Sequence, residues 1–321
     1  MAKLPEHESP TVAAIYDRYR RNASEGPRSH LGASQIGREC LRALWYDLRW
    51  VTDGEAFPGR ILRLFETGNI EEDRLINDLR AIGVTVECRG SDGRQFGFVD
   101  HGGHFAGSVD GVVLGIPEAP LTWHLLECKT SNDKHFAELV QYGVKQAKPE
   151  HYAQMITYMD YLELERALYL AVNKNTDEIY SERIHANPNE AARLRDKAER
   201  IIFAARPLPG ISADPAWFKC KFCDHRAVCH ERRPAAVNCR TCLHSTPIDG
   251  GWSCERHKKA LSYNEQLAGC PDHLYIPELV PAAQVDAGDG FVEYESDCKV
   301  FRNGKGGLSS VQIRNEGIRG N

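Results

Sequence analysis

The sequence of 321 residues contains no run of 18 apolar residues and no charged segment followed by an apolar one at its start. We therefore expect a cytoplasmic protein with no membrane-spanning helix and no secretory leader. A strong excess of charge is also missing, because the formal net charge is -5. This balance gives no global sign of nucleic-acid binding. A local nucleic-acid-binding surface remains compatible with the sequence, because the segment from Lys219 to Arg233 contains five Lys or Arg and two acidic residues. Solvated helix faces explain that pattern equally well.

Cysteine is abundant in a chain that otherwise has an ordinary globular composition, with 42% apolar and 26% charged residues. Such a chain can form one large domain with an appendage or two modest domains. Seven of the eleven cysteines fall between residues 220 and 270. In a reducing cytoplasm such a grouping is more typical of metal binding than of disulfides.

Hydrophobic periodicity predicts an α/β protein. Helices are expected over residues 10–23, 59–81, 151–162 and 189–205, in a stretch after residue 134, and in a segment capped by Ser34 that carries Cys40, Leu44 and Leu48 on one face. Strands are expected over residues 84–88, 95–99, 109–114, 121–126, 167–172, 178–184 and 291–294.

One predicted hairpin carries a candidate site. The apolar runs 109–114 and 121–126 flank a turn that contains two prolines. Glu127 and Lys129 are two residues apart on the second strand, so their side chains leave the same face of the sheet, and Asp110 arrives from the neighbouring strand. Carboxylate and carbonyl oxygens suit a hard divalent cation, and the Cys128 main-chain carbonyl adds one more. The alternative is an ordinary surface Glu–Lys pair, which is a frequent pattern.

Two helices add candidates to this site. In the helix at 59–81, Gly68 is followed by an acidic run that includes Glu72. Such a run is usually a solvated face. Because a Gly there would permit close approach of another backbone, Glu72 is a candidate for a third carboxylate of the site. Gln154 and Tyr158 lie one turn apart on the helix at 151–162 and face the same way.

These groups suit the hydrolysis of a phosphodiester. In-line attack by water needs hydroxide near neutral pH and stabilisation of the charge on the phosphate, and bound Mg²⁺ or Mn²⁺ addresses both needs. Asp110, Glu127 and Glu72 would bind the cation. Lys129 would hold the attacking water and the phosphate.

Three motifs resemble those of the RecB-type PD-(D/E)XK nucleases: Gly107-Ser-Val-Asp110, Glu127-Cys-Lys129-Thr130 and Gln154-Met-Ile-Thr-Tyr158. The resemblance implies a restriction-endonuclease-like mixed central sheet flanked by helices. It also implies that Gln154 and Tyr158 touch DNA or order the active site.

The resemblance further implies a type of nuclease. Many relatives have a His four residues after a helix Gly, whereas here Gly68 is followed at that spacing by Glu72, as in the phage exonuclease branch. The implied activity is that of a Mg²⁺- or Mn²⁺-dependent exonuclease that acts on DNA ends or single strands. The implied setting is bacterial or phage recombination, repair or DNA processing, and a recombination or replication protein would be its partner. The alternative is a catalytically silent nucleic-acid-binding or scaffold protein with a nuclease-like core.

A second resemblance concerns Cys220, Cys223 and Cys229 together with the remote Cys40. Their arrangement is similar to the four-cysteine [4Fe-4S] site of AddB-like nucleases and of CRISPR-associated RecB-type exonucleases. Four thiolates suit zinc as well, so spacing alone does not select the metal, and the resemblance is what favours iron–sulfur. Such a cluster would tie the C-terminal segment to the N-terminal helices and restrict the unfolded chain.

A further set, Cys239, Cys242, Cys254 and Cys270, has the spacing of a zinc ribbon or knuckle. His244, His257 and His273 are rival ligands, and a run of reduced thiols in a loop-rich region is the alternative. We expect Cys88, Cys128 and Cys298 to be ordinary thiols.

The chain therefore divides into four expected parts, the first boundary being the Pro- and Gly-rich segment that ends at Gly210. The last part includes a Gly-rich stretch at 303–307 that lacks the full phosphate-loop pattern. The parts are a nuclease core at 1–210, an iron–sulfur segment at 211–236, a zinc-binding module at 237–280 and a C-terminal tail at 281–321, whose Gly-rich stretch at 303–307 is expected to be flexible.

Overall fold

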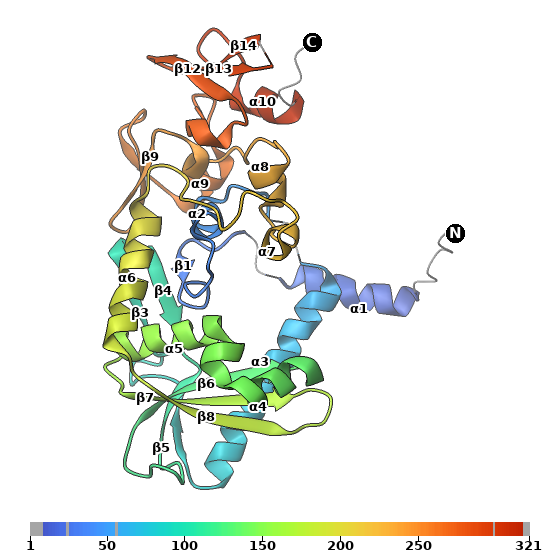
Figure 1. The fold of residues 1–321 in the computed structure, drawn as a ribbon, viewed down its shortest axis with the longest axis vertical. Coiled ribbons are helices and arrows are strands. Elements are labelled where there is room, and N and C mark those ends of the chain that lie inside the picture. Colours follow the sequence, from blue (N-terminus) through green and yellow to red (C-terminus); the bar gives the residue numbers. More distant parts are fainter. Residues whose placement is uncertain (1–8, 24–25, 55–56, 298, 317–321) are drawn as a thin grey trace.

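The computed structural model describes residues 9–23, 26–54, 57–297 and 299–316, and it is built around a five-stranded mixed sheet (Figure 1). The hairpin partners β5 and β6 are antiparallel, β6 and β7 are parallel, and β2 and β8 join the two edges in antiparallel orientation. In sheet order the strands are β2 (Thr85–Glu87), β5 (Gly111–Leu114), β6 (His124–Ser131), β7 (Arg166–Asn173) and β8 (Ile179–His185). The predicted mixed α/β fold is confirmed.

Helices cover both faces of this sheet. The parallel pair β6–β7 needs a crossover connection, which α4 and α5 supply. The helices of this part of the chain are α1 (Pro10–Arg21), α2 (Leu41–Arg49), α3 (Gly59–Ala81), α4 (Asp133–Ala147), α5 (Pro149–Tyr161) and α6 (Pro188–Phe203).

Alternation along β6 sends its side chains into two hydrophobic clusters. Leu126 and Cys128 pack in the cluster that includes Leu75 and Ile76 of α3. Leu125 lies in the larger cluster, which includes buried side chains of α5 and α6. Glu127 and Lys129 follow Leu125 at two-residue spacing, so they lie on the α5 face of the sheet.

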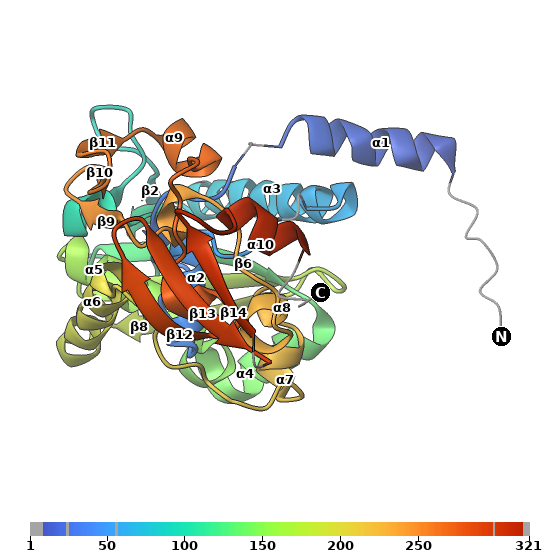
Figure 2. The same ribbon diagram turned by 90° about the horizontal axis from the view of Figure 1, so that it is seen from above.

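The long helix α3 has the bounds that the sequence predicts. It begins against α1, since a Cβ on Gly59 would lie 2.2 Å from the Tyr16 carbonyl oxygen. Helix α1, which has no buried residue, projects from the rest of the molecule (Figure 2). The expectation for Gly68 is wrong, because no described atom outside the adjoining turns of its own helix lies within 4 Å of the position that its Cβ would occupy.

The helix predicted to begin at Ser34 starts later. Cys40 is the N-cap of α2, and residues 33–37 form turns. A Cβ on Gly37 would lie 2.6 Å from the Glu150 Cα, so this segment packs directly on α5 instead of forming a helix.

A small second sheet lies beside the α5 side of the core. It contains β1 (Leu31–Gly32), β4 (Phe105–Ser108) and β3 (Gly97–Asp100), with the 3₁₀ turn η1 (His101–Gly103) between β3 and β4. The predicted strand at 95–99 therefore pairs outside the central sheet.

The C-terminal third contains more regular structure than we expect from its sequence. Two further antiparallel sheets have the orders β11-β10-β9 and β12-β13-β14. The elements are α7 (Phe218–Lys221), α8 (Arg226–His230), η2 (Cys239–Thr241), β9 (Ser245–Ile248), β10 (Gly251–Cys254), β11 (Lys259–Leu261), α9 (Tyr263–Ala268), η3 (Pro277–Leu279), β12 (Ala283–Gly288), β13 (Phe291–Ser296), β14 (Lys299–Gly304) and α10 (Ser310–Glu316).

The predicted strand at 291–294 is present as part of β13. The flexible tail predicted at 303–307 is not found, because this stretch begins in β14 and includes the buried Asn303. Val292 and Tyr294 of β13 and Ile313 of α10 are buried in the same cluster as the core of the central sheet. Their burial stabilises a sheet that the Gly-rich composition conceals. Cys298 and residues 317–321 lie outside the described residues.

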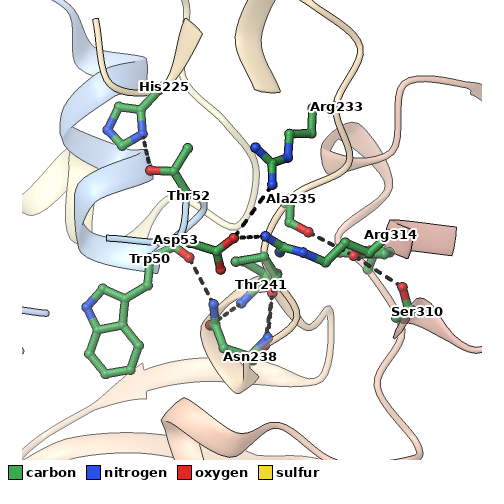
Figure 3. A network of polar contacts seen from close by, with 12 residues as sticks. Trp50, Thr52, Asp53, His225, Arg233, Ala235, Asn238, Thr241, Ser310 and Arg314 are labelled. Carbon is green, nitrogen blue, oxygen red and sulfur yellow. Dashed lines mark hydrogen bonds and ion pairs between the residues drawn. The ribbon is translucent and has the colours of Figure 1, made fainter. Parts of the chain in front are cut away.

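Polar contacts also fasten this segment to the core (Figure 3). Asp53, which follows α2, forms ion pairs with Arg314 of α10 and with Arg233. The Asn238 side chain donates to the Trp50 carbonyl at 2.9 Å.

Among the described residues, no helix combines the length and apolarity that crossing a membrane requires.

Candidate active site

The candidate site lies where strand β6 continues past its partner. Pairing between β5 and β6 ends at Gly111 and Leu126. Beyond this point the Cys128 N–H donates to Oδ2 of Asp110 at 2.8 Å. Since the N–H and C=O of one residue leave the same edge of a strand, the Cys128 carbonyl also points to the Asp110 side. Residues from both faces of the sheet can meet at this edge.

Glu127 and Lys129 form an ion pair at this edge, in which the carboxylate is buried and the Lys129 side chain is partly exposed. Glu127 is 0% exposed and the Lys129 side chain 28% exposed. Apart from the Lys129 ammonium, no described residue donates to either carboxylate oxygen of Glu127. Burial raises the pKa of Glu127 to about 7; Lys129 opposes this shift and Asp110 adds to it. For Lys129 burial acts to lower the pKa, but the Glu127 and Asp110 carboxylates outweigh it and the pKa is raised.

Glu72 approaches the same groups from α3. It is half-buried, and burial followed by the Asp110 carboxylate raises its pKa to about 7, against the opposing effect of Lys129. The structure thus brings together the four predicted charged residues, Glu72, Asp110, Glu127 and Lys129.

Gln154 and Tyr158 of α5 lie behind this group, and both are buried. Their side chains are hydrogen-bonded to each other, and burial followed by the Glu127 carboxylate raises the pKa of Tyr158. A Cβ on Gly107 would lie 2.7 Å from the Tyr158 ring and 2.9 Å from the Ala33 Cβ. Gly107 therefore leaves the space that the Tyr158 ring needs.

Two neighbours of the site were not predicted, His151 and Tyr169. His151 Nδ1 lies 2.9 Å from the Tyr169 hydroxyl, and Tyr169 is the register partner of Glu127 on β7. Burial followed by the positive charge of Lys129 lowers the pKa of His151 to about 3, so the ring is neutral. The signal in the sequence is spacing, because His151, Gln154 and Tyr158 fall at i, i+3 and i+7 on one helix face.

The first cysteine set is also gathered. Burial raises the pKa of Cys220 and of Cys223, and Cys40 and Cys229 add to both shifts. Arg42 Nη1 lies 3.4 Å from the Cys229 Sγ. Residues far apart in the chain are therefore neighbours here.

The second set behaves in the same way. Burial raises the pKa of Cys239 to about 12, with further contributions from Cys270, Cys242 and Cys254. In both sets the thiols are neighbours without converging, since the described part of the chain contains no three His, Cys, Asp or Glu side chains placed to hold one metal ion. Every described cysteine, including Cys88 and Cys128, is a free thiol.

Three solved structures are similar to this chain. LHK-Exo in complex with dAMP is 17% identical over 58% of this chain and 88% of its own, with a TM-score of 0.39. A second structure of LHK-Exo, described as an alkaline exonuclease from Laribacter hongkongensis, is 16% identical over 54% and 86% of the two chains, with a TM-score of 0.38. SSO0001 is 14% identical over 69% of this chain and 97% of its own, with a TM-score of 0.42. No curated protein matches significantly.

The family assignment rests on the sequence match, because all three TM-scores are below 0.5. The family model of the PD-(D/E)XK nuclease superfamily matches residues 12–230, more than half of the chain. The matched segment includes Asp110, Glu127, Lys129, Gln154 and Tyr158. The chain belongs to the PD-(D/E)XK nuclease superfamily.

Proposed function

We propose that the protein is a Mg²⁺- or Mn²⁺-dependent deoxyribonuclease that hydrolyses phosphodiester bonds at DNA ends. The observation that carries this proposal is the carboxylate of Glu127, which is fully buried beside Asp110 and Glu72 and forms an ion pair with Lys129. Burying carboxylates together is costly unless cations compensate them. A divalent cation among them would remove that cost.

The donor chemistry fits a hard cation, and binding would require the carboxylates to turn toward a common point, since no three described acidic side chains are already placed to hold one ion. Asp110, Glu127 and Glu72 would hold it, together with the Cys128 main-chain carbonyl, all of which are oxygen ligands. When bound, such a cation lowers the pKa of a water molecule and neutralises charge on the phosphate. Lys129 would give up part of its contact with Glu127 when the cation binds.

The remaining residues act on the substrate and the water. The raised pKa of Lys129 keeps its ammonium protonated, so it donates hydrogen bonds to the attacking water and to a phosphate oxygen and does not serve as a base. The raised pKa of Tyr158 keeps its hydroxyl neutral, so it can donate as well. Gln154 orients that hydroxyl through their shared hydrogen bond.

The choice of an exonuclease rests on the position of Glu72, four residues after Gly68, which matches the phage exonuclease pattern. The proposed setting is recombination, repair or DNA processing in the cytoplasm of a bacterium or of a phage-infected cell. A recombination or replication protein would be the natural partner of such an enzyme.

A digestion assay tests the proposal. Linear duplex, covalently closed circular duplex and single-stranded DNA are incubated with the protein and Mg²⁺, and with EDTA as the metal-free control. We expect loss of linear DNA from its ends with Mg²⁺ and no cleavage of closed circles. Cleavage of closed circles would show an endonuclease, and no digestion of any substrate would favour the scaffold alternative.

We also propose that Cys40, Cys220, Cys223 and Cys229 bind a [4Fe-4S] cluster that holds residues 211–236 against the core. The gathering of four thiols from distant parts of the chain supports it. Anaerobically purified protein should be brown and contain about four irons per chain, and Cys223→Ser should lose them. A colourless protein whose first cysteine set binds zinc would contradict this assignment.

A further inference from the structure

A row of three side chains crosses the central sheet at the candidate site. Glu127 of β6 is the register partner of Tyr169 of β7, and Tyr169 is in turn the register partner of Glu182 of β8. Register partners on neighbouring strands point to the same face of a sheet. Tyr169 therefore lies between two carboxylates on the face that α5 covers. Because it is only 1% exposed, its hydroxyl must find its hydrogen bonds within the protein.

The two carboxylates of this row differ in their donors. Glu182 accepts hydrogen bonds from the Val144 N–H and from the Tyr180 hydroxyl, each at 2.7 Å. Glu127 has only the Lys129 ammonium among the described residues. Glu182 is thus satisfied without Tyr169, whose hydroxyl can serve the Glu127 side of the row.

The Tyr169 hydroxyl is held by His151 of α5. The hydroxyl oxygen lies 2.9 Å from His151 Nδ1, which is its one hydrogen-bond partner in the described part of the chain. The imidazole is neutral, so one of its ring nitrogens accepts a hydrogen bond. With Nδ1 as the acceptor, the Tyr169 proton points to α5, and the oxygen can still accept a hydrogen bond from a second donor.

Lys129 brings such a donor close. It stands two residues beyond Glu127 on β6, yet its ammonium pairs with the Glu127 carboxylate. The Lys129 side chain therefore reaches back along the strand to the row that contains Tyr169. Residues placed diagonally across two strands are within reach of a long side chain. Of the charged groups around Tyr169 and His151, Lys129 also has the largest effect on the pKa of each.

We propose that Tyr169 and His151 are positioning residues for Lys129. Tyr169 donates its proton to His151 Nδ1 and offers its oxygen to the Lys129 ammonium, which can only donate. When Glu127 turns to a bound cation, the Tyr169 oxygen becomes the acceptor that keeps the ammonium in the site. Lys129 then stays in place to donate to the attacking water and the phosphate. This inference rests on the proposed function.

The first measurement is Mn²⁺ binding to the full chain without DNA, by isothermal titration calorimetry. Lys129 and the cation compete for Glu127, so a second acceptor for the ammonium favours cation binding. Tyr169→Phe removes that acceptor and should weaken Mn²⁺ affinity roughly tenfold, the weight of one hydrogen bond to a charged group. In a Lys129→Met background the same substitution should leave Mn²⁺ affinity unchanged, because the ammonium that it serves is gone.

The second measurement is the kinetics of DNA digestion. Tyr169→Phe should lower kcat roughly 10- to 100-fold, the range typical of residues that orient a site from behind, and leave KM nearly unchanged. His151→Ala should lower kcat in the same direction. His151→Asn keeps an acceptor near the place of Nδ1 and should restore most of that loss.

Tyr180→Phe is the matched control. Tyr180 also carries a hydroxyl that is bonded to a carboxylate of the row, but on the side away from Lys129. Its replacement should leave both Mn²⁺ affinity and kcat unchanged. Thermal unfolding checks that each variant folds. If Tyr169→Phe does not fold, His151→Ala and His151→Asn supply the same comparison in both measurements.

Three outcomes would overturn the inference. One is Mn²⁺ affinity that Tyr169→Phe leaves unchanged, and another is an equal loss of affinity with and without Lys129. The third is an equal loss of kcat in Tyr169→Phe and Tyr180→Phe. A wild type that binds Mn²⁺ but digests no DNA would contradict the proposed nuclease, while the coupling to Lys129 in Mn²⁺ binding still decides this inference. A wild type that binds no Mn²⁺ would contradict both.

Discussion

Binding of the catalytic cation should depend steeply on pH, because Glu72 and Glu127 both have a pKa of about 7. Both carboxyl groups must lose their protons to ligate a metal. One unit below that pKa, at pH 6, releasing each proton costs about 1.4 kcal/mol. Affinity for Mn²⁺ should therefore be roughly 100-fold weaker at pH 6 than at pH 8, with about two protons released per ion at pH 6 and almost none at pH 8.

Isothermal titration calorimetry of DNA-free protein measures both quantities, when each titration is repeated in two buffers that differ in ionisation enthalpy. Glu72→Gln is the matched variant, and it should lower proton release at pH 6 by about one. Equal affinity at pH 6 and pH 8 would refute the reasoning. So would proton release that Glu72→Gln leaves unchanged.

Without the cation, the same raised pKa values should make the protein less stable as pH rises. Between the unfolded value of about 4.5 and the folded value of about 7, the native state holds more protons than the unfolded state at Glu72 and Glu127. The free energy of unfolding should therefore fall across this range and level off above pH 7. Urea unfolding in EDTA at pH 5, 6, 7 and 8 measures it, and a rise across the range would contradict the assignment.

Three further predictions concern single features of the molecule. Lys129→Ala should abolish cleavage but keep the fold, because the Glu127 carboxylate left without its partner can take up a proton near neutral pH. Circular dichroism checks the fold and the digestion assay checks cleavage. Cleavage that survives in this variant would contradict the mechanism. Gly107→Ala should lower the free energy of unfolding by about 1–3 kcal/mol and reduce activity, because the added Cβ would meet the Tyr158 ring. Gly68→Ala, which has open space around it, should instead stabilise α3 by about 1 kcal/mol. Deleting residues 283–321 should lower the melting temperature, because the deletion uncovers part of the main cluster; an unchanged melting temperature would restore the tail interpretation.

Local patterns were enough to predict the centre of the site. A proline-containing turn between two apolar runs predicts the hairpin, and two-residue spacing places Glu127 and Lys129 on one face. Helical spacing in the same way pairs Gln154 with Tyr158. These features depend on neighbours in the chain, which the sequence displays directly.

Contacts between distant segments could not be predicted in this way. Tyr169 on β7 meets His151 on α5, and it is placed beside Glu127 by the parallel pairing of β7 with β6, which the sequence alone does not display. Arg49 and Arg240 are 191 residues apart in the sequence, and arginines are ordinarily expected at the surface. Nothing in the sequence therefore indicates that both are buried and that Arg49 donates to the Arg240 carbonyl. The strand at 291–294 was predicted and is part of β13, but its partners β12 and β14 were not. Strand β12 is exposed along its whole length, which removes the alternation that identifies a strand.

Cleavage of an end-labelled linear duplex by wild type, Lys129→Ala and Glu127→Gln tests the central claim most directly, with Mg²⁺ and with EDTA. The group formed by Asp110, Glu127 and Lys129 should make the wild type release labelled nucleotides with Mg²⁺ and not with EDTA. Both variants should be inert while they remain folded. Metal-dependent cleavage by either variant at the wild-type rate would contradict the assignment of this edge of β6 as the catalytic centre.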